Sequence, residues 1–330
     1  MSLAAGSGPT ARLGPAARLG PTAGSGPTAG SGPAAGSGPA AGHASLSAPP
    51  PASRWLVACD LDRTLIYSRR AAGPLPLQEL VTAEHLDGAA ASFLTVRAHR
   101  LLRDLASTAT FVPVTTRTLA QYRRVDLGVP VRYAIAANGG HLLVDGHPDG
   151  GWARAVRVRL RQAGLGLTDV ARRAEALADP AWARTVRTAD GLFVYVVAHD
   201  RDRIPDLAEL AAWLGEGGWT MSVQGRKVYL VPAMLTKSAA LAEVRRRCGH
   251  PPVAAAGDSL LDREMLDAAD AAVRPAHGEL EEQGWVGPRV QVVPESGAIG
   301  GEAVLARLLD IVAAPPRTTA AAFARWTARM

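Results

Sequence analysis

The sequence predicts an α/β fold in which a doubly wound parallel sheet forms the core and a smaller α+β cap is inserted into it. Over 53–146 and 231–314, short apolar runs alternate with segments of helical spacing. Such alternation is typical of a parallel sheet with right-handed crossovers. Between 147 and 230 the rhythm changes, and a late hairpin there favours antiparallel pairing. The chain of 330 residues has room for about two domains.

The core begins with "LVACD" at 56–60, an apolar run with a polar end that predicts a buried parallel strand. A helix is expected next at 92–107, where the spacing of the leucines is helical. The remaining core elements follow in this order: a strand at 110–118, a helix at 119–127, a strand-turn-strand unit at 133–146, a helix at 236–249, a strand at 252–259, a helix at 260–269, strands at 270–275 and 290–295, and a helix at 300–314.

The insert contains four structured segments, at 152–164, 192–200, 205–218 and 219–232. They predict strands, at least one helix and a hairpin that turns at Gln224-Gly225. We therefore expect an α+β cap with antiparallel pairing over 147–230.

The two ends of the chain differ from the rest. Residues 1–52 consist almost entirely of Gly, Ser, Pro and Ala, which cannot bury enough apolar surface to offset the entropy of ordering. They predict a disordered tail, and a mis-assigned translation start is the alternative. Residues 315–330 are expected to form a short C-terminal tail.

Composition excludes several classes of protein. The net charge is +6, but no stripe of basic residues is interleaved with aromatics, so we do not expect nucleic acid as a partner. No stretch approaches the ~18 apolar residues of a membrane helix, and the N-terminus lacks a secretory apolar region. Cys59 and Cys248 are too few for a disulfide framework, and a reducing cytoplasm is the simplest setting.

Polar residues gather at the predicted carboxyl ends of core strands, where ligands bind in open α/β sheets. Carboxylate clusters suit Mg²⁺, which prefers oxygen ligands, and a lysine beside the metal would help to neutralise a bound phosphate. The residues concerned are Asp60 and Asp62 after the first strand, Thr115 and Thr116 after the second, Lys237 at the start of a helix, and Asp258 and Asp262 after the following strand.

Two neighbouring aspartates raise each other's pKa. Their presence at one strand end therefore suggests a nearby cation or a different chemical role for each of them. Asp60 and Asp62 can both serve if one attacks phosphorus and the other handles the proton of the leaving oxygen. Lys237 supports this interpretation, because Lys227 and Lys237 are the only lysines among 36 basic residues. A compact ammonium differs from a planar guanidinium at such a site.

These motifs resemble the haloacid dehalogenase superfamily over about residues 54–313. "DLDRT" resembles its first motif, "VPVTTRT" its second, Lys237 its third and "GDSLLD" its fourth. "AANGG" and "GRKVYLVPAMLTKSAAL" resemble the subgroup with a C2-type cap, and within it the sucrose-phosphatase-like and mannosylglycerate-phosphate phosphatase-like members. The resemblance implies a Mg²⁺-dependent phosphatase that forms an aspartyl-phosphate intermediate.

The resemblance also implies roles for individual residues. Asp60 would be the nucleophile and a metal ligand, and Asp62 would be the acid/base with its carbonyl oxygen on the metal. Thr115 would hydrogen-bond the phosphoryl group, with Thr116 as the alternative, Lys237 would balance its charge, Asp258 would bind Mg²⁺, Asp262 would orient Lys237 or a metal-bound water, and Asn138 would lie near the phosphoryl site.

Two departures from the family concern substrate choice. Arg63 and Thr116 both stand where the family usually has glycine, and either can narrow the entrance or contact substrate. We expect the cap to select the substrate, a small phosphorylated metabolite such as a sugar phosphate. Arg226 and Lys227 on its hairpin would bind substrate hydroxyls or a second anionic group, and the alternative is that they are solvated hairpin charges. A phosphomutase and a catalytically idle binding protein remain as alternatives.

Overall fold

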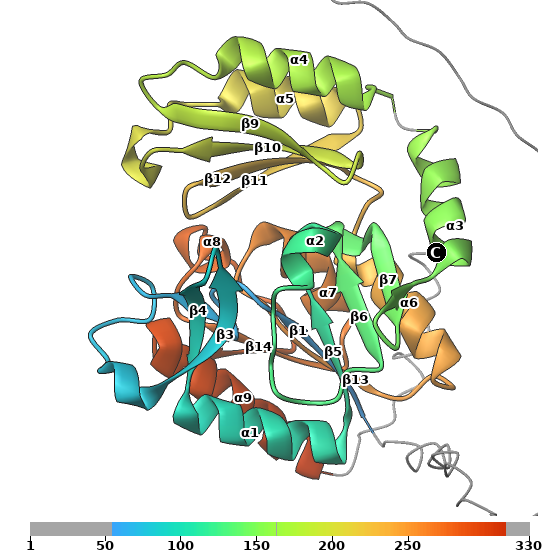
Figure 1. The fold of residues 1–330 in the computed structure, drawn as a ribbon. Helices are drawn as coiled ribbons and strands as arrows, with labels where there is room; N and C mark the ends of the chain where they lie inside the picture. Colours follow the sequence, from blue (N-terminus) through green and yellow to red (C-terminus); the bar gives the residue numbers. More distant parts are fainter. Residues whose placement is uncertain (1–54, 163, 315–330) are drawn as a thin grey trace, which may run out of the picture. The chain divides into compact units, whose positions relative to one another are not determined.

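The computed structural model describes residues 55–162 and 164–314, shown in colour in Figure 1. The predicted tails at 1–52 and 315–330 lie outside the described residues. Within the described residues, no helix combines the length and the apolar character needed to cross a membrane.

The core sheet has eight strands in the order β15-β14-β13-β1-β5-β6-β7-β8. The strands from β15 to β6 pair in parallel, and β7 and β8 add antiparallel pairs at one edge. The strand order runs outward from β1 on both sides, which confirms the predicted doubly wound sheet. The bounds are β1 (Leu56–Asp60), β5 (Thr110–Val114), β6 (Tyr133–Ala136), β7 (His141–Val144), β8 (His147–Pro148), β13 (Val253–Ala256), β14 (Ala271–Pro275) and β15 (Val290–Val293).

Alternate residues of β1 enter two different hydrophobic clusters, because successive side chains of a strand point to opposite faces. Val57 and Cys59 pack in one cluster with residues of helices α1 (Val96–Thr108) and α9 (Gly297–Ala313). Leu56 and Ala58 pack in the other with residues of α6 (Lys237–Arg247) and α7 (Arg263–Ala268). Figure 1 shows α1 and α9 side by side beneath the sheet. All five residues of β1 are buried, as the apolar run predicts.

The helix predicted at 92–107 begins only at Val96, and this part of the prediction is wrong. Its first residues belong to β4, which pairs with β2 and β3 in an antiparallel sheet that the sequence reading missed. Leu94 belongs to a strand and is buried there, so its helical spacing to the later leucines is accidental. Thr95 accepts a hydrogen bond from the Ala98 N–H and caps the helix. The strands are β2 (Tyr67–Ser68), β3 (Leu80–Leu86) and β4 (Ala89–Thr95), preceded by the short η1 (Leu77–Glu79).

The helix predicted at 119–127 is a single turn, α2 (Leu119–Tyr122). Thr118 and Gln121 form a capping box at its start. The chain then leaves the helix because Val125 forms an isolated bridge with Glu84 of β3, and the Asp126 N–H donates to the Ala83 carbonyl oxygen. Tertiary pairing with β3 thus outweighs the local helical pattern.

The insert forms a separate four-stranded antiparallel sheet in the order β11-β12-β10-β9, which confirms the predicted α+β cap. Two helices cover one face of this sheet (Figure 1). The hairpin turns at Gly225-Arg226, one residue later than predicted, because Gln224 pairs with Lys227. The bounds are β9 (Ala183–Ala189), β10 (Phe193–Ala198), β11 (Trp219–Gln224), β12 (Lys227–Pro232), α4 (Leu167–Leu177), α5 (Ala208–Glu216) and η3 (Arg201–Arg203).

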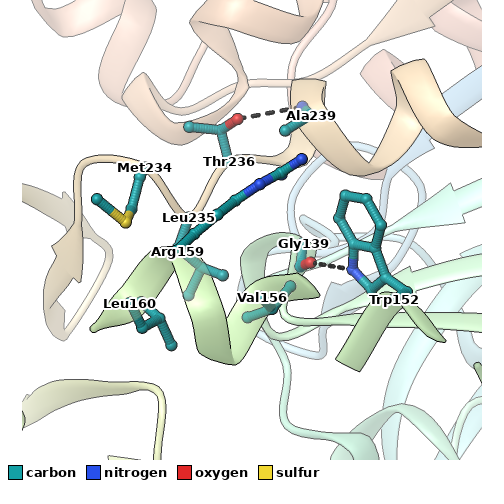
Figure 2. Close-up of a pocket in the computed structure, with 9 residues that line it drawn as sticks. All are labelled: Gly139, Trp152, Val156, Arg159, Leu160, Met234, Leu235, Thr236 and Ala239. Carbon is teal, nitrogen blue, oxygen red and sulfur yellow. Dashed lines mark hydrogen bonds between the residues drawn. The ribbon is translucent and has the colours of Figure 1, made fainter. Parts of the chain in front are cut away.

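Helix α3 (Gly150–Leu160) and the segment that returns to the core at 233–236 lie next to each other. Figure 2 shows the Trp152 indole N–H directed at the Gly139 carbonyl oxygen, which it reaches at 2.8 Å. Gly139 has φ +96°, and a Cβ there would lie 2.2 Å from the Thr236 carbonyl oxygen. Only glycine permits the backbone at position 139 to lie so close to the segment at 233–236 that returns to the core.

Helix α8 (Glu279–Glu282) of the core joins the cap at β11. The Glu279 carboxylate accepts hydrogen bonds from the Ser222 hydroxyl at 2.5 Å and the Val223 N–H at 2.8 Å, and from the core Leu260 N–H at 3.0 Å. Burial raises the pKa of Glu279, and these hydrogen bonds oppose the rise. Arg201 of η3 pairs with Glu282 nearby. The cap is therefore held over the carboxyl ends of the core strands.

Candidate active site

The strand order of the core sheet reverses between β1 and β13, and the carboxyl ends of these strands carry the acidic residues. Asp60 is the last residue of β1, and Asp258 follows β13 by two residues. Asp262 ends the short η4 (Leu260–Asp262). Ligand oxygens of these three carboxylates all lie within 4.8 Å of one another, and all three residues are buried. The sheet thus brings together carboxylates that are about 200 residues apart in sequence, at the place where such sheets bind ligands.

Lys237, the first residue of α6, is the cation of this cluster. Its Nζ lies 2.5 Å from Asp60 Oδ1 and 2.6 Å from Asp262 Oδ1. The side chain is only 1% exposed. Asp262 has no free carboxylate oxygen, because its Oδ2 also accepts from the Ser259 hydroxyl and N–H. Asp262 is therefore placed to hold Lys237 against Asp60.

The buried cluster carries more negative than positive charge. Burial raises the pKa of Asp60 to about 7, against the opposing charge of Lys237 and with the help of Asp262. Burial also raises the pKa of Asp258 well above its usual range, and Asp60 and Asp262 add to the rise. Arg63, with its Nε 3.7 Å from Asp258 Oδ2, opposes it.

The donor set fits a divalent cation. Three buried carboxylates face one buried ammonium, and hard oxygen ligands of this kind are those that Mg²⁺ prefers. Gly278 has φ +92°, and a Cβ there would lie 2.4 Å from Asp258 Oδ2. Any residue other than glycine at this position would therefore clash with that carboxylate oxygen. Asp60 and Asp258 are the residues that would hold the metal.

Asp62 is turned away from this cluster and paired with Arg117, a residue that the sequence reading did not select. The Arg117 Nε and an Nη bind the two Asp62 oxygens at 2.7 and 2.8 Å. Burial acts to raise the pKa of Asp62, but the charge and hydrogen bonds of Arg117 outweigh it, and the pKa is lowered. The other Nη of Arg117 binds Glu84 at 2.7 Å, and Ser92 donates to the same carboxylate at 2.8 Å.

Arg117 lies two residues after Thr115, and Glu84 lies on β3 of the sheet that was not predicted. No sequence spacing links these residues to Asp62. The only sequence signal for Arg117 is its position in "TTR", directly after the second predicted strand. Only the two threonines of this stretch were predicted to be functional. A bidentate pair of this kind fixes a carboxylate in orientation as well as in charge.

Replacing Arg117 with glutamine is expected to lower the free energy of unfolding by roughly 3 kcal/mol, mainly because it leaves the buried Glu84 without its main cation, while Asp62 is 41% exposed. Urea unfolding followed by circular dichroism measures the loss. Arg124→Gln is the matched control, since Arg124 also binds Glu84 but is 36% exposed and lies outside the Asp62 pair. A loss no larger than that of the control would contradict a stabilising role for the buried pair.

Arg63 occupies a backbone position that favours glycine. Its φ is +66°, in the left-handed region that costs most other residues about 1 kcal/mol. This explains why glycine is expected at this point of the motif. The arginine side chain lines the pocket beside Asp258, and His277 is hydrogen-bonded to the Arg63 carbonyl oxygen at 2.7 Å.

Thr115 and Asn138 lie next to each other at the ends of β5 and β6. The Asn138 N–H donates to the Thr115 carbonyl oxygen at 3.0 Å, and Thr115 Oγ1 accepts from the Arg117 N–H at 3.1 Å. Thr115 and Thr116 are both buried. Asn138 is 2% exposed, and its Oδ1 has no hydrogen-bond partner among the described residues, while its Nδ2 donates to the Leu235 carbonyl oxygen.

A pocket of about 540 Å³ extends from the core to the cap hairpin. Asp62, Arg63 and Asp258 line its floor, and Arg226 and Lys227 line the side formed by the cap. The structure therefore places both predicted cap residues opposite the carboxylates. The other predicted site residues are buried and do not line this pocket: Asp60, Thr115, Thr116, Asn138, Lys237 and Asp262.

The doubly wound sheet, the inserted cap and the acidic cluster at the switch point define a haloacid dehalogenase-type fold. The fold is similar to that of sucrose-phosphatase from Synechocystis, solved in complex with sucrose and phosphate, with a TM-score of 0.55 and 16% identity over 78% of this chain and 98% of that chain. A protein of Thermoplasma acidophilum gives a TM-score of 0.50 with 14% identity over 78% of this chain and 99% of that chain.

A phosphatase of the haloalkanoate (HAD) enzyme superfamily from Bacteroides thetaiotaomicron gives a TM-score of 0.47 with 15% identity, over 82% of this chain and 99% of that chain. No family model matches the sequence, and no curated protein is found to match it. At these identities the likeness is one of fold, and the structures from Synechocystis and Thermoplasma confirm the fold expected from the motifs.

Proposed function

We propose that the protein is a Mg²⁺-dependent phosphatase that hydrolyses a small phosphorylated metabolite through an aspartyl-phosphate. The observation that carries this proposal is the placement of Asp60 at the switch point, held by Lys237 and beside the carboxylate of Asp258. The reaction belongs to the cytoplasm in this proposal, where thiols such as the free Cys59 and Cys248 remain reduced.

Asp60 and Asp258 would hold the Mg²⁺, which when bound supplies positive charge to the phosphoryl oxygens. An oxygen of Asp60 attacks phosphorus, the bond to the leaving oxygen breaks, and Asp62 gives that oxygen a proton. Asp62, now a carboxylate, then takes a proton from the water that attacks the aspartyl-phosphate. This releases phosphate and restores the Asp60 carboxylate. Lys237 and the Thr115 hydroxyl bind the phosphoryl oxygens.

Arg117 bears on the two steps in opposite ways. Its pair with Asp62 favours the carboxylate form, which suits activation of water in the second step. The first step needs the protonated form of Asp62.

The first experiment is phosphate release from p-nitrophenyl phosphate with and without Mg²⁺. Turnover that requires the metal supports the phosphatase, and absence of turnover of this substrate and of a panel of metabolite phosphates supports the idle binding protein. Transfer of the phosphoryl group to a second hydroxyl of a sugar phosphate, without release of phosphate, would support the phosphomutase. The sucrose and phosphate in the similar sucrose-phosphatase structure make sugar phosphates the first class to screen.

Removal of metal is expected to abolish activity, and Asp258→Ala is expected to raise the Mg²⁺ concentration required for half-maximal rate by at least about tenfold. The reason is that a buried carboxylate ligand contributes more than the ~1.4 kcal/mol that corresponds to tenfold in binding. Titration of Mg²⁺ into EDTA-treated enzyme, read as rate and as thermal midpoint, measures both.

Asp310→Ala is the control, because Asp310 is 68% exposed on α9 and does not line the pocket. Full activity of EDTA-treated enzyme would show that the acidic cluster is not a metal site.

A further inference from the structure

The cap side of the pocket carries positive charge that carboxylates of the described residues balance only in part. Three basic residues line it, and Asp200 is the acidic residue among its lining residues. Arg201 is paired with Glu282 of the core. For Arg226 and Lys227, no carboxylate of the described residues lies within ion-pair distance, and Arg226 has only a long hydrogen bond of 3.4 Å to the His199 carbonyl oxygen.

The core side of the site differs from the cap side, because each of its carboxylates has a cation beside it. Arg117 holds Asp62, and Lys237 holds Asp60. Arg63 lies 3.7 Å from Asp258. The positive charge of the cap hairpin is therefore not needed to neutralise the core carboxylates, although Lys227 contributes to lowering the pKa of Asp62.

Lys227 is held by two tyrosines rather than by an acid, and its side chain is hydrogen-bonded to that of Tyr229. Its Nζ lies 5.9 Å from the ring centroid of Tyr229 and 6.0 Å from that of Tyr195. These tyrosines face each other across the β10–β12 pair, and Lys227 is paired with Val197 in the same two strands. A cation held against two tyrosine rings at the hairpin end of a sheet is preorganised for a ligand.

The chemistry of these side chains decides between the two kinds of ligand expected for them. A sugar hydroxyl both donates and accepts hydrogen bonds, so a site for neutral sugars needs acceptors as well as donors. Lysine and arginine only donate, and a carboxylate or phosphate only accepts. Arg226 and Lys227 have no carboxylate partner among the described residues, and their remaining donors therefore match an anion at the end of the pocket opposite the phosphoryl site.

We infer that the substrate is a phosphate monoester whose leaving group carries a second anionic group, a carboxylate or a phosphate, which Arg226 and Lys227 bind. This inference rests on the proposed phosphatase activity and specifies its substrate class. The phosphoryl group occupies the floor, and the second anion occupies the side of the pocket formed by the cap hairpin.

Two matched pairs of sugar-sized compounds test it. Glucose 6-phosphate and 6-phosphogluconate differ by a carboxylate, and fructose 6-phosphate and fructose 1,6-bisphosphate differ by a phosphate, so the two pairs distinguish the source of the anion. At least one of the charged members is expected to have a kcat/KM about tenfold or more above its neutral partner. Lys227→Met and Arg226→Gln are expected to remove this preference through KM, and to lower kcat/KM for the charged members about tenfold more than for p-nitrophenyl phosphate, which carries no second anion.

Arg184→Gln is the control, because Arg184 is an exposed arginine of the cap that does not line this pocket. Equal kcat/KM within both pairs, or equal loss for charged and neutral members in the Lys227 and Arg226 variants, would overturn the inference while p-nitrophenyl phosphate turnover upholds the phosphatase. No turnover of any of these compounds would overturn the proposed function. Binding of the same pairs to Asp60→Asn by calorimetry then tests the anion site by itself, and equal affinities would overturn it.

Discussion

Asp60→Asn is expected to lower the rate of phosphate release by at least about 10³-fold, because an amide does not attack phosphorus and the covalent intermediate cannot form. The loss should appear in kcat for every substrate, including p-nitrophenyl phosphate. Single-turnover phosphate release measures it, and mass spectrometry of acid-quenched enzyme detects the aspartyl-phosphate in the wild-type protein.

The fold should survive this substitution. Burial already raises the pKa of Asp60 to about 7, so a neutral side chain of the same shape removes a charge that the site does not fully compensate. Circular dichroism and the thermal midpoint verify this. Asp145→Asn is the matched control, since Asp145 is exposed and has φ +48°, a conformation that asparagine accepts. Substantial turnover by folded Asp60→Asn enzyme would rule out the covalent mechanism.

Lys237→Met is expected to damage both stability and activity. Lys237 is 1% exposed between Asp60 and Asp262, and its removal leaves two buried carboxylates without their cation. Breaking a buried pair in this way costs roughly 3–5 kcal/mol of unfolding free energy. Urea unfolding of metal-free protein measures the stability, and phosphate release measures the activity.

The other lysine of the chain supplies the control. Lys227→Met removes the same charge and the same length of side chain from the cap hairpin, where Lys227 has no ion pair within the described residues and contacts two tyrosines. A stability loss below about 1 kcal/mol is expected there. If the two variants lose the same small amount, the buried ion pairs of Lys237 do not stabilise the protein.

The outline of the fold could be predicted because it depends on local pattern. "LVACD" is apolar at every position until its last residue, and β1 is buried along its whole length. The same kind of run identified β5 and β13, and the order of these elements implied a doubly wound sheet. The prediction that the helix starts at Ser92 is wrong because the apolar spacing continues from the end of a strand into the helix. Thr95 divides the two elements and caps the helix.

The sequence by itself determined which residues stand at the ends of strands and hence which chemical groups meet at the sheet's switch point. Asp60, Asp258 and Lys237 follow from the positions of β1, β13 and α6 alone. Only the tertiary structure decided the partners of these groups. Asp62 is held by Arg117, 55 residues away, and Lys237 reaches Asp60 across 177 residues. Such pairings depend on how separate elements pack, because side-chain contacts between them leave no spacing in the sequence.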